Sequence, residues 1–138
     1  NIVRTLEAAV NVGLGYLKLH QPAHSLSGGE AQRLKIAKEL SKKTGKNTLY
    51  ILDEPSIGQH MDDVTRLIEI LQKIVDRGNS VILIEHHPQI LANCDYLIEL
   101  GPGGGRNGGY IVAKGTPEEF IKANTATSRY LKRIISET

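Results

Sequence analysis

The fold of this chain is decided by residues 49–87, which open with LYILDEP (49–55) and close with VILIEHH (81–87). Each end of this stretch carries four apolar residues rich in strand formers, and a pattern with helical periodicity lies between them. The apolar positions of that helix are 64, 67, 68, 71, 74 and 75, and Asp62 is predicted to cap it. Strand, helix and strand predict an α/β fold with a parallel βαβ core. Because both apolar runs are unbroken, we expect both strands to be buried on both faces.

Further elements are predicted on either side of this core. Upstream, one helix is expected over residues 1–19 and a second from Ser27 to about Lys43. Their apolar faces are predicted to consist of Ile2, Leu6, Ala9 and Val10 in the first and of Ala31, Leu34, Ala37 and Leu40 in the second. Downstream, strands around residues 96–100 and 110–113 are joined by a glycine-rich turn, and helices are predicted from Pro117 and from Thr127.

The composition excludes several classes of protein. The chain has 138 residues, 40% hydrophobic and 23% charged, which suits one ordinary folded domain and is not typical of disorder. It contains no apolar run of about 18 residues, so no membrane-spanning helix is expected. A single cysteine, Cys94, rules out a disulfide framework or a cysteine-rich zinc site within the chain and fits a reducing, cytoplasmic setting. A net charge of +2 does not by itself indicate a nucleic-acid partner.

Polar side chains follow both core strands at the edge where α/β proteins bind ligands. Asp53 and Glu54 end the first strand, and Glu85 and His86 end the second. An aspartate there can hold Mg²⁺, a glutamate can orient an attacking water, and an imidazole can hydrogen-bond a terminal phosphate. Two carboxylates at a strand exit are also common without any function. His87 is expected to face solvent.

The segment LSGGE (26–30) marks the start of the second helix. Ser27 and Glu30 have the spacing of a capping box, in which each side chain bonds the other residue's backbone amide. Capping leaves Gly28 and Gly29 unexplained, because each glycine costs a helix about 1 kcal/mol relative to alanine. Bare glycines at a helix N-terminus admit an anion to free N–H groups, so a phosphate site is predicted here. Arg33 lies one turn further on, and the other cations of this helix are expected on a solvated face.

The order of these parts resembles the second half of an ABC-type ATPase domain, a P-loop NTPase-like fold. No Gly-x-x-x-x-Gly-Lys-Ser/Thr string occurs, so the Walker A half is missing from this sequence and residues 101–109 are interpreted as a hairpin turn. The resemblance divides the chain into a signature helix (about 26–43), a core with Walker B, D-loop and switch (about 48–100), and a hairpin with C-terminal helices (101–138). It makes residues 56–62 the D-loop and His86 the switch histidine.

Within that superfamily the chain is similar to the UvrA family, the damage-recognition ATPases of the ABC excinuclease in nucleotide excision repair. The segments that carry this resemblance are 13–17, 21–23, 26–33, 84–86, 100–102 and 111–113 with 115–118. The resemblance implies the C-terminal part of a second ATPase module and two ATP sites, each formed between two modules set head to tail. Asp53 (with Mg²⁺), Glu54 and His86 would then serve one site, with Glu54 and His86 catalytic. Ser27, Gly28 and Gly29 would serve the other, and Glu30 and Gly58 are also expected to bind nucleotide.

The same resemblance implies the partners. They are the rest of a UvrA-like chain, a second copy of it in a homodimer, a UvrB-like repair protein and duplex DNA bound by the full-length protein. ATP and Mg²⁺ are the implied cofactors, and zinc is expected only outside this chain. Without a Walker A loop, this piece alone is expected not to turn over ATP. Because it has no convincing stripe of Lys and Arg, it is also expected to bind duplex DNA weakly or not at all.

Two alternatives remain open from the residues. Ser56-Ile57, Gln59 and Gly103 depart from the residues that the family commonly has, which leaves room for a paralogue with a regulatory or resistance role. The other alternative is the ATPase component of an ABC transporter. Its D-loop usually reads Ser-Ala-Leu-Asp, however, and residues 56–59 here read SIGQ.

Overall fold

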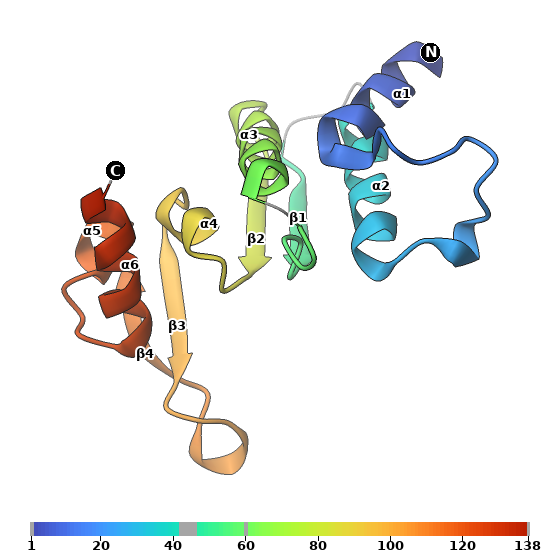
Figure 1. Ribbon diagram of the computed structural model, residues 1–138. Helices are drawn as coiled ribbons and strands as arrows, with labels where there is room; N and C mark the ends of the chain where they lie inside the picture. Colours follow the sequence, from blue (N-terminus) through green and yellow to red (C-terminus); the bar gives the residue numbers. More distant parts are fainter. Residues whose placement is uncertain (1, 42–46, 60, 138) are drawn as a thin grey trace. The chain divides into compact units, whose positions relative to one another are not determined.

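The computed structural model describes residues 2–41, 47–59 and 61–137, which form two compact units, Asn1–Glu85 and His86–Thr138. The first unit holds the βαβ core and the helices before it (Figure 1). Its elements are α1 (Ile2–Ala9), the π-helical turn η1 (Val10–Leu14), the 3-10 helix η2 (Ala23–Ser25), α2 (Gly28–Ser41), β1 (Leu49–Asp53), α3 (Met61–Asp76) and β2 (Ser80–Ile84). None of the helices described in either unit is long and apolar enough to cross a membrane.

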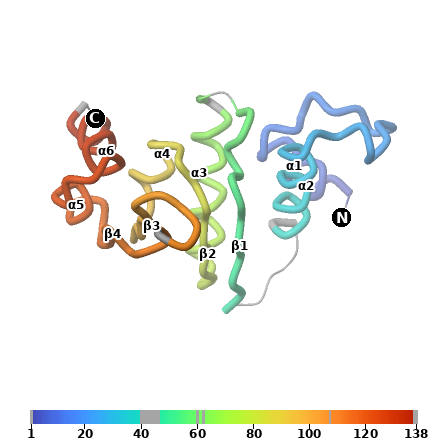
Figure 2. Tube along the Cα trace, turned by 90° about the horizontal axis from the view of Figure 1, so that it is seen from below, coloured from blue at the N-terminus to red at the C-terminus, as the bar shows by residue number. Residues whose placement is uncertain are grey.

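The core is the predicted βαβ unit. β1 and β2 are parallel, in a register that pairs Leu49 with Ser80 and Asp53 with Ile84. The connecting helix α3 lies beside the two strands (Figure 2). The pairing of Asp53 with Ile84 brings the residues that follow the two strands to one edge of the sheet.

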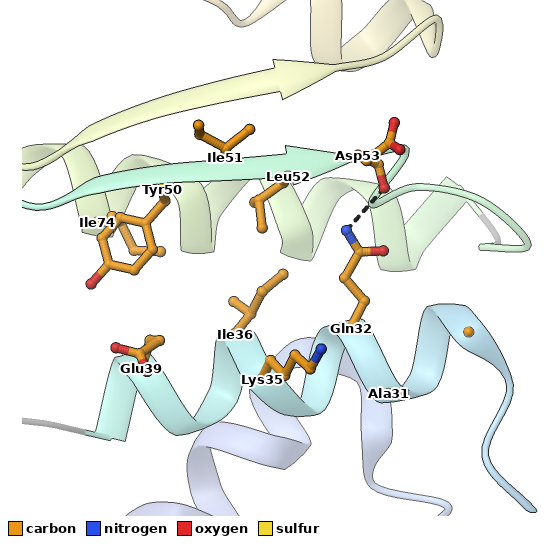
Figure 3. A pocket seen from close by; sticks show the side chains of 11 residues that line it. Ala31, Gln32, Lys35, Ile36, Glu39, Tyr50, Ile51, Leu52, Asp53 and Ile74 are labelled. Carbon is orange, nitrogen blue, oxygen red and sulfur yellow. Dashed lines mark hydrogen bonds between the residues drawn. The ribbon is translucent and has the colours of Figure 1, made fainter. Parts of the chain in front are cut away.

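The prediction that both strands are buried on both faces is wrong. Exposure alternates along each strand, and Ile51, Ile82 and Ile84 are 65%, 51% and 56% exposed. In Figure 3, Tyr50 and Leu52 point toward α2, whereas Ile51 points to the opposite side of the strand. An apolar run indicates that burial of both faces of the strand would be favourable. In the described part of this unit, however, the helices cover one face of the sheet only.

α3 follows its predicted pattern closely. The buried positions include Val64, Leu67, Leu71 and Ile74 as expected, together with Ile70. The helix begins at Met61, so Asp62 lies in its first turn and not at the predicted cap. Beyond its end, the buried Asn79 accepts a hydrogen bond from the Thr48 amide (3.1 Å) and donates one to the Ile74 carbonyl (2.9 Å). This side chain joins the last turn of α3 to the start of β1.

The first helix is shorter than predicted and buries different residues. α1 ends at Ala9, and Gly13 in η1 has φ +78°, which breaks the helical period. A Cβ at Gly13 would lie 3.0 Å from the Asp63 carboxylate, so the turn passes close to α3. The buried residues are therefore Ala8, Val12 and Leu14, whereas the expected Ile2, Leu6 and Val10 are exposed.

α2 forms where predicted, although its buried face is rotated from the expected one. Ile36 and Ala37 are buried with Arg33, whereas Leu34 is 43% exposed. α1 and η1 pack against this helix and select the face that is covered. The predicted end near Lys43 and the side chain of Leu40 lie outside the described residues.

The second unit is an antiparallel hairpin with helices. It consists of α4 (Pro88–Ala92), β3 (Leu97–Gly101), the 3-10 helix η3 (Gly105–Asn107), β4 (Tyr110–Gly115), α5 (Pro117–Phe120) and α6 (Ala126–Glu137). β3 and β4 pair as predicted, with the glycine-rich segment forming the turn between them. Leu97, Ala113, Phe120 and Leu131 form its core. The short α4 was not predicted from the sequence.

Candidate functional site

The start of α2 has the predicted capping box. The Glu30 amide donates to Ser27 Oγ (3.2 Å), and the Ser27 amide donates to Glu30 Oε2 (2.7 Å). The two glycines between them have different surroundings. A Cβ at Gly28 would meet nothing within 4 Å, whereas a Cβ at Gly29 would lie 3.3 Å from the Ile57 carbonyl oxygen. Gly28 therefore borders open space, and Gly29 lets the helix approach the loop that follows β1.

Glu30 is held on both carboxylate oxygens. The Tyr16 hydroxyl donates to Glu30 Oε1 while Oε2 accepts the Ser27 amide. The bond to Glu30 raises the pKa of Tyr16. The same bond, together with the Ser27 amide, lowers the pKa of Glu30. Glu30 thus has a structural role within the chain, and its contact with a nucleotide stays a prediction.

Replacing Tyr16 with phenylalanine is expected to raise the pKa of Glu30 toward its ordinary value, because the strongest contact of the carboxylate is lost. A lowered folded pKa stabilises above the unfolded glutamate pKa, and that contribution disappears as pH falls through the folded pKa. The raised pKa of Tyr16 acts in the opposite sense: its contribution is lost as pH rises through the folded tyrosine pKa. The Tyr16–Glu30 bond therefore stabilises the folded chain at pH values between the folded pKa of Glu30 and the folded pKa of Tyr16.

An NMR titration of the Glu30 carboxyl carbon measures this change. Tyr130→Phe is the matched control, because Tyr130 is an exposed tyrosine on α6. An unchanged Glu30 titration in Tyr16→Phe would contradict the assigned bond.

The end of β1 and the loop after it, residues 53–58, carry the second group of candidates. The Glu54 amide donates to the Ile84 carbonyl (2.9 Å), and the Ser56 amide donates to Glu85 Oε1 (2.8 Å). These bonds fasten the loop to the end of β2. Glu54 has φ +44°, a left-handed conformation that residues other than glycine rarely adopt and that is found disproportionately at functional sites. Gly58 has φ +71° and so occupies a position that favours glycine.

The loop also contacts α2 through a residue that the sequence analysis did not single out. Gln32 Nε2 donates to the Asp53 carbonyl oxygen at 2.9 Å (Figure 3). This bond lies at one end of a groove of about 510 Å³, which Lys35 and Glu39 line from α2 and Tyr50 and Leu52 line from β1. Gln32 is four residues after Gly28, so helical spacing places the two on one face. This spacing is the feature of the sequence from which a role for Gln32 beside Gly28 could have been predicted.

The structure thus brings Ser27, Gly28, Gly29 and Glu30 into one unit with Asp53, Glu54 and Gly58. His86 is exposed and is the first residue of the second unit. His87 is half-buried and occupies the N-cap of α4, so the prediction that it faces solvent is wrong. The start of α4 at Pro88 places His87 in a capping position, which strand alternation could not indicate.

The buried Arg33 supports the start of α2. It is 9% exposed, and its Nη1 lies 4.0 Å from the Cβ position at Gly29. Its charge also contributes to the lowered pKa of Glu30, after the contributions of Tyr16 and Ser27. Arg33 therefore lies beside Gly29, about one helical turn away as its spacing predicts.

No family model matches the chain. Curated sequences do match it. It is 53% identical over 137 residues to UvrABC system protein A of Aquifex aeolicus, covering 99% of this chain and 15% of that protein. It is also 53% identical over 135 residues to UvrABC system protein A of Bacillus subtilis, covering 97% of this chain and 14% of the relative. The chain therefore spans about one seventh of the length of these relatives.

Solved structures agree with the sequence matches. The crystal structure of UvrA2 from Deinococcus radiodurans matches with a TM-score of 0.90 and 50% identity, covering 96% of this chain and 16% of that one. An ATP-binding cassette of an ABC transporter in its ADP conformation matches with a TM-score of 0.56 and 19% identity, covering 95% of this chain and 49% of that chain. The similarity to the transporter cassette is one of fold alone. The architecture is therefore that of part of an ABC-type ATPase domain.

Proposed function

Because this chain belongs to the UvrA family, we propose that it is the part of a DNA-repair ATPase that contributes catalytic and signature residues to ATP sites. The observation that carries the proposal is the loop after β1, where Asp53 and the left-handed Glu54 are fastened both to the end of β2 and to the start of α2. A rigid support on two sides is what a group that orients a water molecule requires.

Asp53, Glu54 and His86 are proposed to serve one ATP site. The exposed Asp53 carboxylate, at the exit of β1, is a hard oxygen ligand of the kind that Mg²⁺ prefers. Bound Mg²⁺ would supply charge neutralisation at the phosphates of ATP. The Glu54 carboxylate orients the attacking water and accepts its proton, while His86 donates a hydrogen bond to the terminal phosphate. Gly58 allows the D-loop to turn toward the nucleotide.

The start of α2 is proposed to serve the other ATP site. Its free backbone N–H groups and the positive end of the helix dipole favour a phosphate. The open space beside Gly28 admits that phosphate, and the Ser27–Glu30 capping box holds the first turn in place. The site is completed by a Walker A loop from another module, which the 138 residues do not contain.

The proposed partners follow from the family. They are the remainder of a UvrA-like chain, a second copy in a head-to-tail dimer, a UvrB-like protein and duplex DNA. ATP and Mg²⁺ are the proposed cofactors, zinc belongs to regions outside this chain, and the setting is cytoplasmic. The 138-residue piece alone is expected not to hydrolyse ATP.

The proposal is tested on the full-length protein that contains this chain. Damaged and undamaged duplexes of one sequence are titrated with ATP at one stated salt concentration, because phosphate contacts make affinity depend on salt. The wild type is expected to prefer the damaged duplex, and Glu54→Gln is expected to change that preference. If the protein bound both duplexes equally and still hydrolysed ATP, the repair function would be rejected in favour of a paralogue with another role. Absence of both hydrolysis and DNA binding would reject both functions.

A further inference from the structure

The first turns of α2 dock on the loop that follows β1. Gln32 Nε2 lies 2.9 Å from the Asp53 carbonyl oxygen, and the Cβ position at Gly29 lies 3.3 Å from the Ile57 carbonyl oxygen. The two positions lie on one face of the helix, opposite the two ends of the segment 53–57. The helix therefore holds this segment through one hydrogen bond and approaches it closely at Gly29, where a side chain would crowd the Ile57 carbonyl.

The same segment is held from its other side by β2. The Ile84 carbonyl accepts the Glu54 amide, and Glu85 Oε1 accepts the Ser56 amide. The segment between Asp53 and Ile57 thus has α2 on one side and the end of β2 on the other. A shift of either neighbour must move the segment or break one of these hydrogen bonds.

Gln32 is the residue best placed to transmit such a shift. Its partner is the backbone carbonyl that joins Asp53 to Glu54, so a displacement of Gln32 acts on the peptide unit between the two carboxylates. The left-handed conformation of Glu54 leaves this peptide little freedom to adjust. Movement of the first turns of α2 would therefore change the direction of both side chains.

We propose that Gln32 is a positioning residue that couples two ATP sites. The inference rests on the proposed function, in which Asp53 and Glu54 serve one site and Gly28 and Gly29 serve the other. Nucleotide at the start of α2 then biases the position of the Asp53–Glu54 peptide through Gln32, and nucleotide at Asp53 biases α2 by the same amount. Reciprocity of this kind is required of any coupling between binding sites.

The test measures coupling in the full-length protein with the Asp53–Glu54 site fixed in two states. Glu54→Gln is expected to hold ATP there without hydrolysing it, and Asp53→Ala is expected to leave the site empty. Asp53→Ala keeps the backbone carbonyl that Gln32 contacts. The ratio of the KM values for ATP at the remaining site, one from each background, is the coupling factor. With Gln32 present we expect at least about fivefold, the lower end of typical allosteric coupling.

Substitutions at Gln32 then separate its hydrogen bond from its bulk. Gln32→Met keeps the length of the side chain and removes the donor, so the coupling factor is expected to fall to within about twofold of one. Gln32→Lys restores a donor and is expected to restore coupling. Gln72→Met is the matched control, because Gln72 is an exposed glutamine on α3 whose side chain bonds Asp76 at 3.1 Å. It is expected to leave the coupling factor unchanged.

Each outcome decides the matter. Coupling that survives Gln32→Met, or a loss that Gln32→Lys does not restore, overturns the role of Gln32. A coupling factor of one with Gln32 in place also overturns it, while hydrolysis at the remaining site leaves the proposed function standing. Absence of ATP hydrolysis in the unmodified protein overturns the proposed function, and the inference falls with it.

Discussion

Glu54→Gln in the full-length protein is expected to lower ATP turnover at its site by at least about 100-fold, the lower bound for losing a general base. The amide has almost the shape of the carboxylate but cannot accept the proton of the attacking water. ATP is expected to bind still, because Asp53 is unchanged. Steady-state phosphate release and equilibrium nucleotide binding, measured side by side, separate the two effects.

Glu54→Gln tests catalysis separately from folding, because it leaves the backbone conformation at position 54 unchanged. Glutamine at position 54 keeps the φ of +44° and the bond from the backbone amide to Ile84, so the free energy of unfolding should change by no more than about 1 kcal/mol, the centre of the range for single substitutions. Glu54→Gly should instead gain about 1 kcal/mol by relieving the left-handed strain, and should lose turnover equally. If Glu54→Gly were more stable but inactive, the Glu54 carboxylate would be needed for turnover although its backbone conformation costs stability.

Glu69→Gln is the control. It makes the same chemical change on the exposed face of α3, in the same unit of the structure as Glu54. It is expected to leave turnover as in the wild type. If Glu54→Gln hydrolysed ATP within about threefold of the wild-type rate, a role worth the 100-fold expected of a general base would be excluded.

Local patterns in the sequence were enough to predict the framework of the fold. The parallel pair, the α3 stripe, the β3–β4 hairpin and the Ser27–Glu30 capping box were all predicted correctly. Each depends on residues near one another in sequence, or on a strand–helix–strand order that allows few topologies. The capping box could be identified from spacing alone, because its two members are three residues apart.

Contacts between distant residues could not be predicted in this way. Gln32 meets the Asp53 carbonyl across 21 residues, and Tyr16 meets Glu30 across 14. Neither pair forms a periodic pattern, and a backbone carbonyl as a partner leaves no trace in the residue types. Gly13 could have warned that the first helix ends early, but a left-handed glycine and a π-helical turn alter the period in a way that only coordinates reveal.

The second large expected effect is a loss of ATP turnover on substitution of Gly28, the first glycine of α2. The surroundings of Gly28 and Gly29 differ, so the two substitutions are expected to have different effects. A methyl group at Gly28 meets nothing within 4 Å, so Gly28→Ala should fold at least as well as the wild type and gain up to about 1 kcal/mol in helix propensity. Its turnover at the site served by α2 is nevertheless expected to fall by about 10- to 100-fold. The new methyl group would occupy the space through which a phosphate reaches the backbone N–H groups, and loss of one such donor commonly costs that much or more.

Gly29→Ala is the matched partner, with its methyl group 3.3 Å from the Ile57 carbonyl oxygen. The helix or the loop must then move by a few tenths of an ångström, which costs about 1 kcal/mol, the low end for overpacking, and offsets the gain in helix propensity. Gly29→Ala should therefore be about 1 kcal/mol less stable than Gly28→Ala. Chemical denaturation and ATP turnover of both variants distinguish ligand space from packing. If Gly28→Ala kept full turnover, the phosphate would have to bind elsewhere than beside Gly28. If both variants lost activity only in proportion to stability, the glycine pair would serve the docking of α2 and no nucleotide.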